Sequence, residues 1–151
     1  MAKLSAFTRD AKAMREGAWI NPGDEYGFQI KAKAMGAAYS DRRADKMRAV
    51  ARNTVGGESK VKSEDRNKID IESLCEVCLL DVRGLEHDDG RPVTIAEFKQ
   101  MILQPEYTEL AVISFQCAGQ VGQTNAALIE QAEGNSLTGS STTSNGLTTE
   151  T

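Results

Sequence analysis

The chain has 151 residues and a net charge of −4, with charged residues making up 26% of its composition. This length allows one domain with a hydrophobic core, and no stretch approaches the roughly 20 apolar residues of a membrane span. Residues 1–20 lack the apolar core of a secretory signal, and three cysteines in such a chain argue for reduced thiols and against a disulfide framework. We therefore expect a cytosolic protein.

The first predicted elements are a helix over residues 5–16 and a β-hairpin after it. Its strand signals cover residues 18–20 and 26–32, and apolar and polar side chains alternate from residue 28 to residue 32. Pro22 and Gly23 predict a type II turn between the strands. A two-stranded hairpin is marginal alone in water, so its apolar face must pack on the chain's own helices or on another protein.

Four further helical segments are expected. A helix over residues 34–52 is rich in alanine and arginine, and a charged loop over 60–68 separates it from an apolar helix over 69–82. Thr94 begins another helix with the capping box that it forms with Glu97, and Pro105 ends that helix and permits a new one from residue 106. The inner positions expected for the 34–52 helix are Met35, Ala38, Tyr39, Met47, Val50 and Ala51.

The sequence predicts that the chain ends in a polar tail after a short helix or linker. Residues 124–132 predict a short helix with few apolar positions, and nearly every residue from Gly134 onward is serine, threonine, glycine or asparagine. The expected fold is therefore α+β and mainly helical, with an N-terminal β-hairpin packed on a bundle of about four helices. The expected organisation is a globular domain over 1–122, a short helix or linker over 123–133, and a flexible tail over 134–151.

Two interpretations of the cysteines are considered, as ligands of a metal ion or as buried core residues. Cys75 and Cys78 have the spacing of half a zinc site, which His87 and Cys117 could complete. Both cysteines lie in an apolar helical stripe, where a free cysteine behaves as a small buried hydrophobe, and this reading is favoured. The sequence also lacks a nucleophile motif, a phosphate loop and a dinucleotide fingerprint. We expect no catalytic residues, no metal and no cofactor.

A basic stretch and the hairpin are the candidate binding features. Arg42, Arg43 and Arg48 belong to a basic helix face that could contact phosphates, but it lacks interleaved aromatic residues. A solvated face or a surface for an acidic protein partner is favoured over nucleic acid. Trp19 and Phe28 are equally divided between core and interface.

The order of elements resembles the tail assembly chaperones of long-tailed bacteriophages, over about residues 6–118 and by pattern rather than by an invariant motif. This chain departs from the family at residues 82–84, Val-Arg-Gly, where relatives often carry a tryptophan. The segments that carry the resemblance are Glu16-Gly17-Ala18-Trp19-Ile20, Phe28-Gln29-Ile30-Lys31-Ala32, Leu79-Leu80-Asp81-Val82, Asp89-Gly90-Arg91-Pro92-Val93-Thr94 and the helices with Phe98 and after Pro105.

The resemblance implies a non-enzymatic protein of the host cytoplasm that coats the tape measure protein, helps to recruit tail tube subunits and is absent from the finished virion. It implies no nucleic-acid or membrane partner, and self-association stays open. The alternative from another class is a structural virion component, such as a tail completion or head-tail connector protein. The candidate partner-binding residues are Trp19, Ile20, Phe28, Ile30, Arg42, Arg43 and Arg48.

Overall fold

The computed structural model describes residues 1–121 and 123. The described residues divide into two units, one of residues 11–121 and the other of residues 1–10 with residue 123. In the second unit, Leu4–Phe7 forms a 3₁₀ turn (η1). The single helix predicted over residues 5–16 is therefore wrong, since α1 covers only Ala11–Glu16. The helix predicted over 124–132 and the tail predicted from residue 134 lie outside the described residues.

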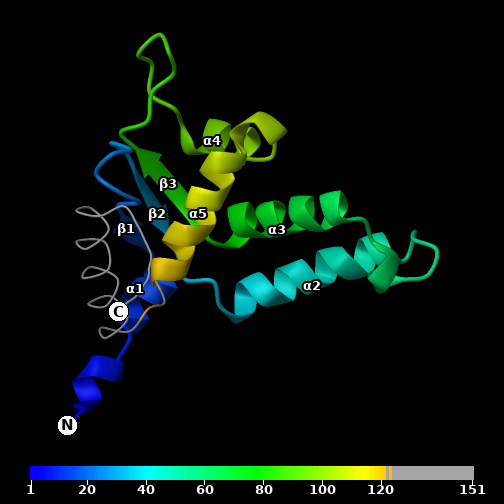
Figure 1. Ribbon diagram of the computed structural model, residues 1–151, viewed down its shortest axis with the longest axis horizontal. Coiled ribbons are helices and arrows are strands. Elements are labelled where there is room, and N and C mark those ends of the chain that lie inside the picture. The colour runs from blue at the N-terminus through cyan, green and yellow to red at the C-terminus, as the bar shows by residue number, and fades with distance from the viewer. Residues whose placement is uncertain (122, 124–151) are drawn as a thin grey trace, which may run out of the picture. The chain divides into compact units, whose positions relative to one another are not determined.

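The unit of residues 11–121 has an α+β fold, as predicted (Figure 1). The two strands of the predicted hairpin are confirmed as β1, Ala18–Ile20, and β2, Gln29–Ala32. A third strand, β3 (Leu79–Arg83), pairs with the other edge of β2, so the sheet has the order β1-β2-β3 and is antiparallel throughout. The hairpin is thus part of a larger sheet.

The predicted reversal at Pro22 and Gly23 has a different geometry. A type II turn requires a φ near +80° at its third residue, whereas Gly23 has a φ of 159°. Instead, the Asn21 side chain accepts a hydrogen bond from the Gly23 backbone N–H (3.0 Å), and the Tyr26 N–H donates to the Gly23 carbonyl (3.0 Å). The strands are consequently joined by a longer loop that begins with an Asx turn.

Four helices follow the first two strands: α2 (Ala37–Ala51), α3 (Ser63–Val77), α4 (Ile95–Met101) and α5 (Thr108–Val121). Single 3₁₀ turns precede α3 and α5, η2 at Glu58–Lys60 and η3 at Pro105–Tyr107. The predicted capping box of Thr94 and Glu97 is confirmed, with both reciprocal hydrogen bonds present. The helix predicted after Pro105 is confirmed as well.

The helix predicted over 69–82 is displaced at both ends. It begins at Ser63, in the predicted charged loop, because Glu64 and Asp65 in its first turn favour the positive end of the helix dipole. It ends at Val77, because pairing with β2 takes the next residues into β3. The inner positions of α2 are partly confirmed: Tyr39 and Met47 are buried, whereas Met35 and Ala38 are exposed.

The helices cover one face of the sheet and extend beyond it. Helix α5 packs on β1 and β2, while α2 and α3 lie side by side (Figure 1). The main core joins the sheet to α3, α4 and α5 around the fully buried Ile30, Leu74 and Phe98. A second small cluster of Met47, Val61 and Ile69 holds the other end of the α2–α3 pair. No helix among the described residues is long and apolar enough to cross a membrane.

Candidate functional site

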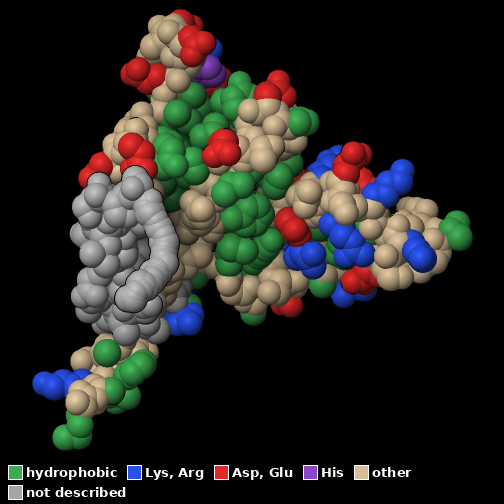
Figure 2. Space-filling model, viewed as in Figure 1, with side chains coloured by type: hydrophobic (Ala, Val, Ile, Leu, Met, Phe, Trp, Pro, Cys, Tyr) green, Lys and Arg blue, Asp and Glu red, His purple; other side chains and the backbone are tan. Residues whose placement is uncertain are grey.

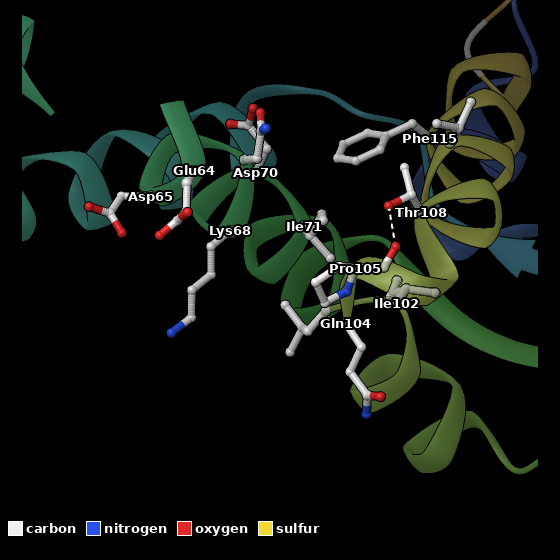
Figure 3. Close-up of a pocket in the computed structure, with 14 residues that line it drawn as sticks. Glu64, Asp65, Lys68, Asp70, Ile71, Ile102, Gln104, Pro105, Thr108 and Phe115 are labelled. Atoms are coloured by element: carbon white, nitrogen blue, oxygen red, sulfur yellow. Dashed lines mark hydrogen bonds between the residues drawn. The ribbon is translucent and has the colours of Figure 1, made fainter. Parts of the chain in front are cut away.

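A groove opens between α3 and α5, and the segment from α4 to η3 closes its lower side (Figure 3). Its volume is about 610 Å³. Figure 2 shows hydrophobic side chains gathered in this region, where α5 passes α3. The apolar side chains that line the groove are Ile71, Ile102, Leu103, Pro105, Ala111, Val112 and Phe115.

Helix α5 supplies the apolar wall because it has two apolar faces. One face is buried in the core and includes Ile113 and Cys117. The groove is lined from α5 by Thr108, Ala111, Val112 and Phe115, which have the spacing of one stripe along a helix, and Ala111 at the edge of this stripe is also buried in the core. Val112 is 47% exposed, so part of its apolar side chain is open to a partner. The sequence prediction placed Ala111 on the apolar side of this helix but did not single out Val112 or Phe115.

Helix α3 supplies the opposite wall and a charged end. Ile71 points into the groove from α3, whereas Glu64, Asp65 and Lys68 lie at one end of it (Figure 3). In the part of the chain that the structure describes, neither Glu64 nor Asp65 forms an ion pair. This end of the groove therefore carries two carboxylates available to a partner and one lysine.

The arginines predicted for partner binding are engaged within the fold. Arg42 donates to Glu76 of α3 (2.8 Å), and Arg43 pairs with Asp70, whose hydrogen bond raises the pKa of the Arg43 guanidinium. Lys46 lies 2.7 Å from Glu76, and its hydrogen bond lowers the pKa of that carboxyl group. The third predicted arginine, Arg48, pairs with Asp45 within α2. The basic face of α2 thus packs against the acidic face of α3.

The predicted hairpin residues lie on two opposite faces of the sheet. Ile20 pairs with Ile30 in the register, and Ile30 and Phe28 are buried in the core, so these two present no surface to a partner. Trp19 pairs with Lys31 and is partly exposed on the other face. Residues adjacent along a strand point to opposite faces, so Trp19 and Ile20 cannot form one contact surface.

The Trp19 ring is covered by a residue of β3. The Arg83 guanidinium lies 4.0 Å from the centre of the Trp19 ring, and Arg83 also donates to Gln29 (2.7 Å). Such a cation–π contact occupies one face of the indole. The contact therefore joins β3 to β1 across the outer face of the sheet.

The cysteines and the histidine lie apart from the groove. Cys75, Cys78 and Cys117 are buried, and burial raises the pKa of each thiol to about 11. His87 instead contacts Glu97 (3.3 Å) beside the capping box of α4. Within residues 1–121 and 123, no group of three or more histidine, cysteine, aspartate or glutamate side chains is arranged to hold a metal ion.

Comparisons with protein-family models, with curated proteins and with solved structures found no match for this chain.

Proposed function

We propose that this protein is a bacteriophage tail assembly chaperone, which acts in the host cytoplasm by binding the tape measure protein and helping to recruit tail tube subunits. It works without catalysis or a cofactor and leaves the tail before the virion is complete. The groove between α3 and α5 receives the partner. The observation that carries the proposal is this open groove, in which Val112, 47% exposed, and the partly exposed Phe115 of α5 lie beside apolar side chains of α3 and of the segment after α4.

The groove supports a binding role for two reasons. Half of its lining side chains are apolar, and apolar surface that meets a partner is the main source of binding free energy. Val112 and the partly exposed Ile71 and Phe115 lie together in it, so the apolar surface is contiguous. The order of elements that resembles tail assembly chaperones supports the identity of the partner.

The test of binding is co-expression with the long helical product of the neighbouring gene, the expected tape measure protein, followed by affinity purification of the tagged chain. The expected result is a stable complex in which the tape measure protein stays soluble. A Val112→Asp variant should lose the complex, because the carboxylate would be desolvated in an apolar contact. The matched control is Val55→Asp, since Val55 is 97% exposed and does not line the groove.

Mass spectrometry of purified virions separates the chaperone from its alternative, a structural component such as a tail completion or head-tail connector protein. A chaperone is expected to be present in infected cells and absent from the particles. Stoichiometric recovery from intact virions would contradict the proposal and favour the structural alternative.

Substitutions of the α2 arginines would not test partner binding alone, because Arg42 and Arg43 form ion pairs with α3. Arg42→Glu with Arg43→Glu places carboxylates beside Glu76 and Asp70, so the exchange repels α3 as well as changing the surface charge. A loss of binding by this variant therefore reports on the α2–α3 pair and not on steering alone. Groove residues give the cleaner test.

A further inference from the structure

We infer that the groove between α3 and α5 binds an amphipathic α-helix whose apolar stripe is flanked by lysine or arginine at the end that meets Glu64 and Asp65. The identity of the partner, the tape measure protein, rests on the proposed function. The helical and basic character of the bound segment is inferred from the groove itself. Three features of the groove point to this occupant: its backbone, its spacing and its charge.

The backbone of the groove walls favours a helix over an extended peptide. The walls are formed mainly by α3 and α5, whose interior N–H and C=O groups are bonded within their own helices. An extended segment would therefore bury unpaired backbone groups against apolar side chains, which costs free energy for every group. A helix satisfies its own backbone and brings only side chains to the contact.

The spacing of the groove residues also matches a helix. Val112 and Phe115 lie three residues apart on α5 and so share one side of that helix, and Ile71 lines the groove from α3 (Figure 3). Two helices pack when the ridge of one enters the groove of the other, and apolar residues at i, i+3, i+4 and i+7 supply that ridge. The occupant would thus become the third helix of a local bundle.

The charge at one end sets the orientation of the occupant. Glu64 and Asp65 line the groove at the N-terminal end of α3 without an ion pair among the described residues, whereas Asp70 is already paired with Arg43. An occupant with basic residues at this end gains two charge pairs, and an acidic one is repelled by the same carboxylates. Lys68 lies at the same end, and these two carboxylates against one lysine leave a net negative charge that favours a basic helix.

Binding is tested with three labelled peptides of about 15 residues, roughly four helical turns, and the full-length protein. The first has leucines at helical spacing with lysines beside them at one end, the second has glutamates in place of the lysines, and the third has a central proline. In fluorescence anisotropy at about 0.05 M salt, the basic peptide should bind about tenfold more tightly than the acidic one. The proline peptide should not bind, because proline breaks the helix.

Variants locate the contact. Val112→Asp should weaken binding of the basic peptide about tenfold or more, and Val55→Asp should not change it. Glu64→Gln with Asp65→Asn should weaken binding about fivefold at low salt and remove most of the preference over the acidic peptide. The matched control, Glu86→Gln with Asp88→Asn, removes the same charge from exposed positions outside the groove.

Circular dichroism shows whether each variant is folded, and sedimentation shows its oligomeric state. Equal binding of the basic and acidic peptides, or binding that Val112→Asp leaves unchanged, would overturn the inference even if the tape measure protein co-purifies. Self-association that Val112→Asp abolishes would overturn it too, since the occupant would then be a second copy of the chain. Peptide binding as expected, without a tape measure complex, would overturn only the proposed function.

Discussion

Burial controls the chemistry of the three cysteine side chains. The thiolate is the form that reacts with disulfide reagents, and a thiol pKa raised from 9.0 to about 11 leaves roughly a hundredth of the usual thiolate fraction. Native protein at pH 8 should therefore react slowly with Ellman's reagent, and protein unfolded in urea should react rapidly at three sites. A thiol that reacts rapidly in the native protein would contradict the burial of Cys75, Cys78 or Cys117.

Glu97 links the stability of α4 to pH. Its carboxylate accepts a hydrogen bond from the Thr94 backbone N–H and contacts His87 and Arg91, and these interactions lower the pKa of Glu97 from 4.5 to about 2. Because the pKa of Glu97 is lower in the folded protein than in the unfolded chain, the ionised carboxylate stabilises the fold at pH values above the unfolded-state pKa of 4.5. This stabilisation is lost as the pH falls toward the folded-state pKa of about 2.

Glu97→Gln should therefore be less stable than the wild type near neutral pH, and the difference should shrink as the pH falls from about 5 to about 2. Urea unfolding at several pH values measures this difference. Glu106→Gln serves as the control, because Glu106 is exposed and forms no hydrogen bond or ion pair with the other described residues. A difference for Glu97→Gln that is independent of pH would refute the assigned role.

The groove residues show why the sequence predicts the core more readily than the site. Ile113 and Cys117 follow the helical spacing of one buried face, which the pattern reveals. Val112 and Phe115 lie outside that face, and only the position of α3 shows that they share a groove. Two apolar faces on one helix are the signal that could have identified them.

At the scale of elements, the pattern of residues 79–82 predicts the end of a helix, whereas the structure has the strand β3 there. The difference has a physical reason. A β-bulge between β2 and β3 leaves Leu80 as an extra residue, because Lys31 pairs with Asp81 and Ala32 with Leu79. The bulge restores both Leu79 and Val82 to the core, and their separation of three residues imitates helical spacing. The alternation of β2 has no such interruption, and its strand was predicted correctly.

Gly84 holds the end of β3 close to the start of β2. Its φ is +83°, and a Cβ atom there would lie 2.9 Å from the Gly27 carbonyl oxygen and 3.3 Å from the Phe28 Cα. Gly84→Ala should destabilise the protein by about 1 to 3 kcal/mol, from backbone strain together with this contact.

Gly90→Ala is the matched control for Gly84→Ala. Gly90 has a φ of +88° but no atom within 4 Å of the added Cβ, so only backbone strain remains. Urea unfolding should show the larger loss of stability for Gly84→Ala. Equal losses of stability in the two variants would mean that residues 27 and 28 move aside without a loss of free energy. The close contact at Gly84 would then not stabilise the position of β3.

At the scale of the whole molecule, the fold and the site rest on different evidence. The α+β class and the β1–β2 hairpin follow from local patterns, and α2, α4 and α5 follow from helix formers and capping signals. The groove depends on two helices that are distant in sequence, and the candidate residues chosen from sequence are instead in the core, on the opposite sheet face or in ion pairs with neighbouring side chains. The packing of two elements that are distant in sequence, such as α3 and α5, produces no local sequence pattern from which the groove could be predicted.

The most direct measurement is amide hydrogen exchange of the full-length protein, free and in complex with the co-expressed tape measure protein. Our account predicts that binding increases protection along α5 at residues 108–115 and along α3 at residues 64–71, the two walls of the groove. It predicts little change in β1, where Trp19 lies under Arg83. New protection confined to β1 and the outer face of the sheet, with both walls unchanged, would contradict the groove as the partner site.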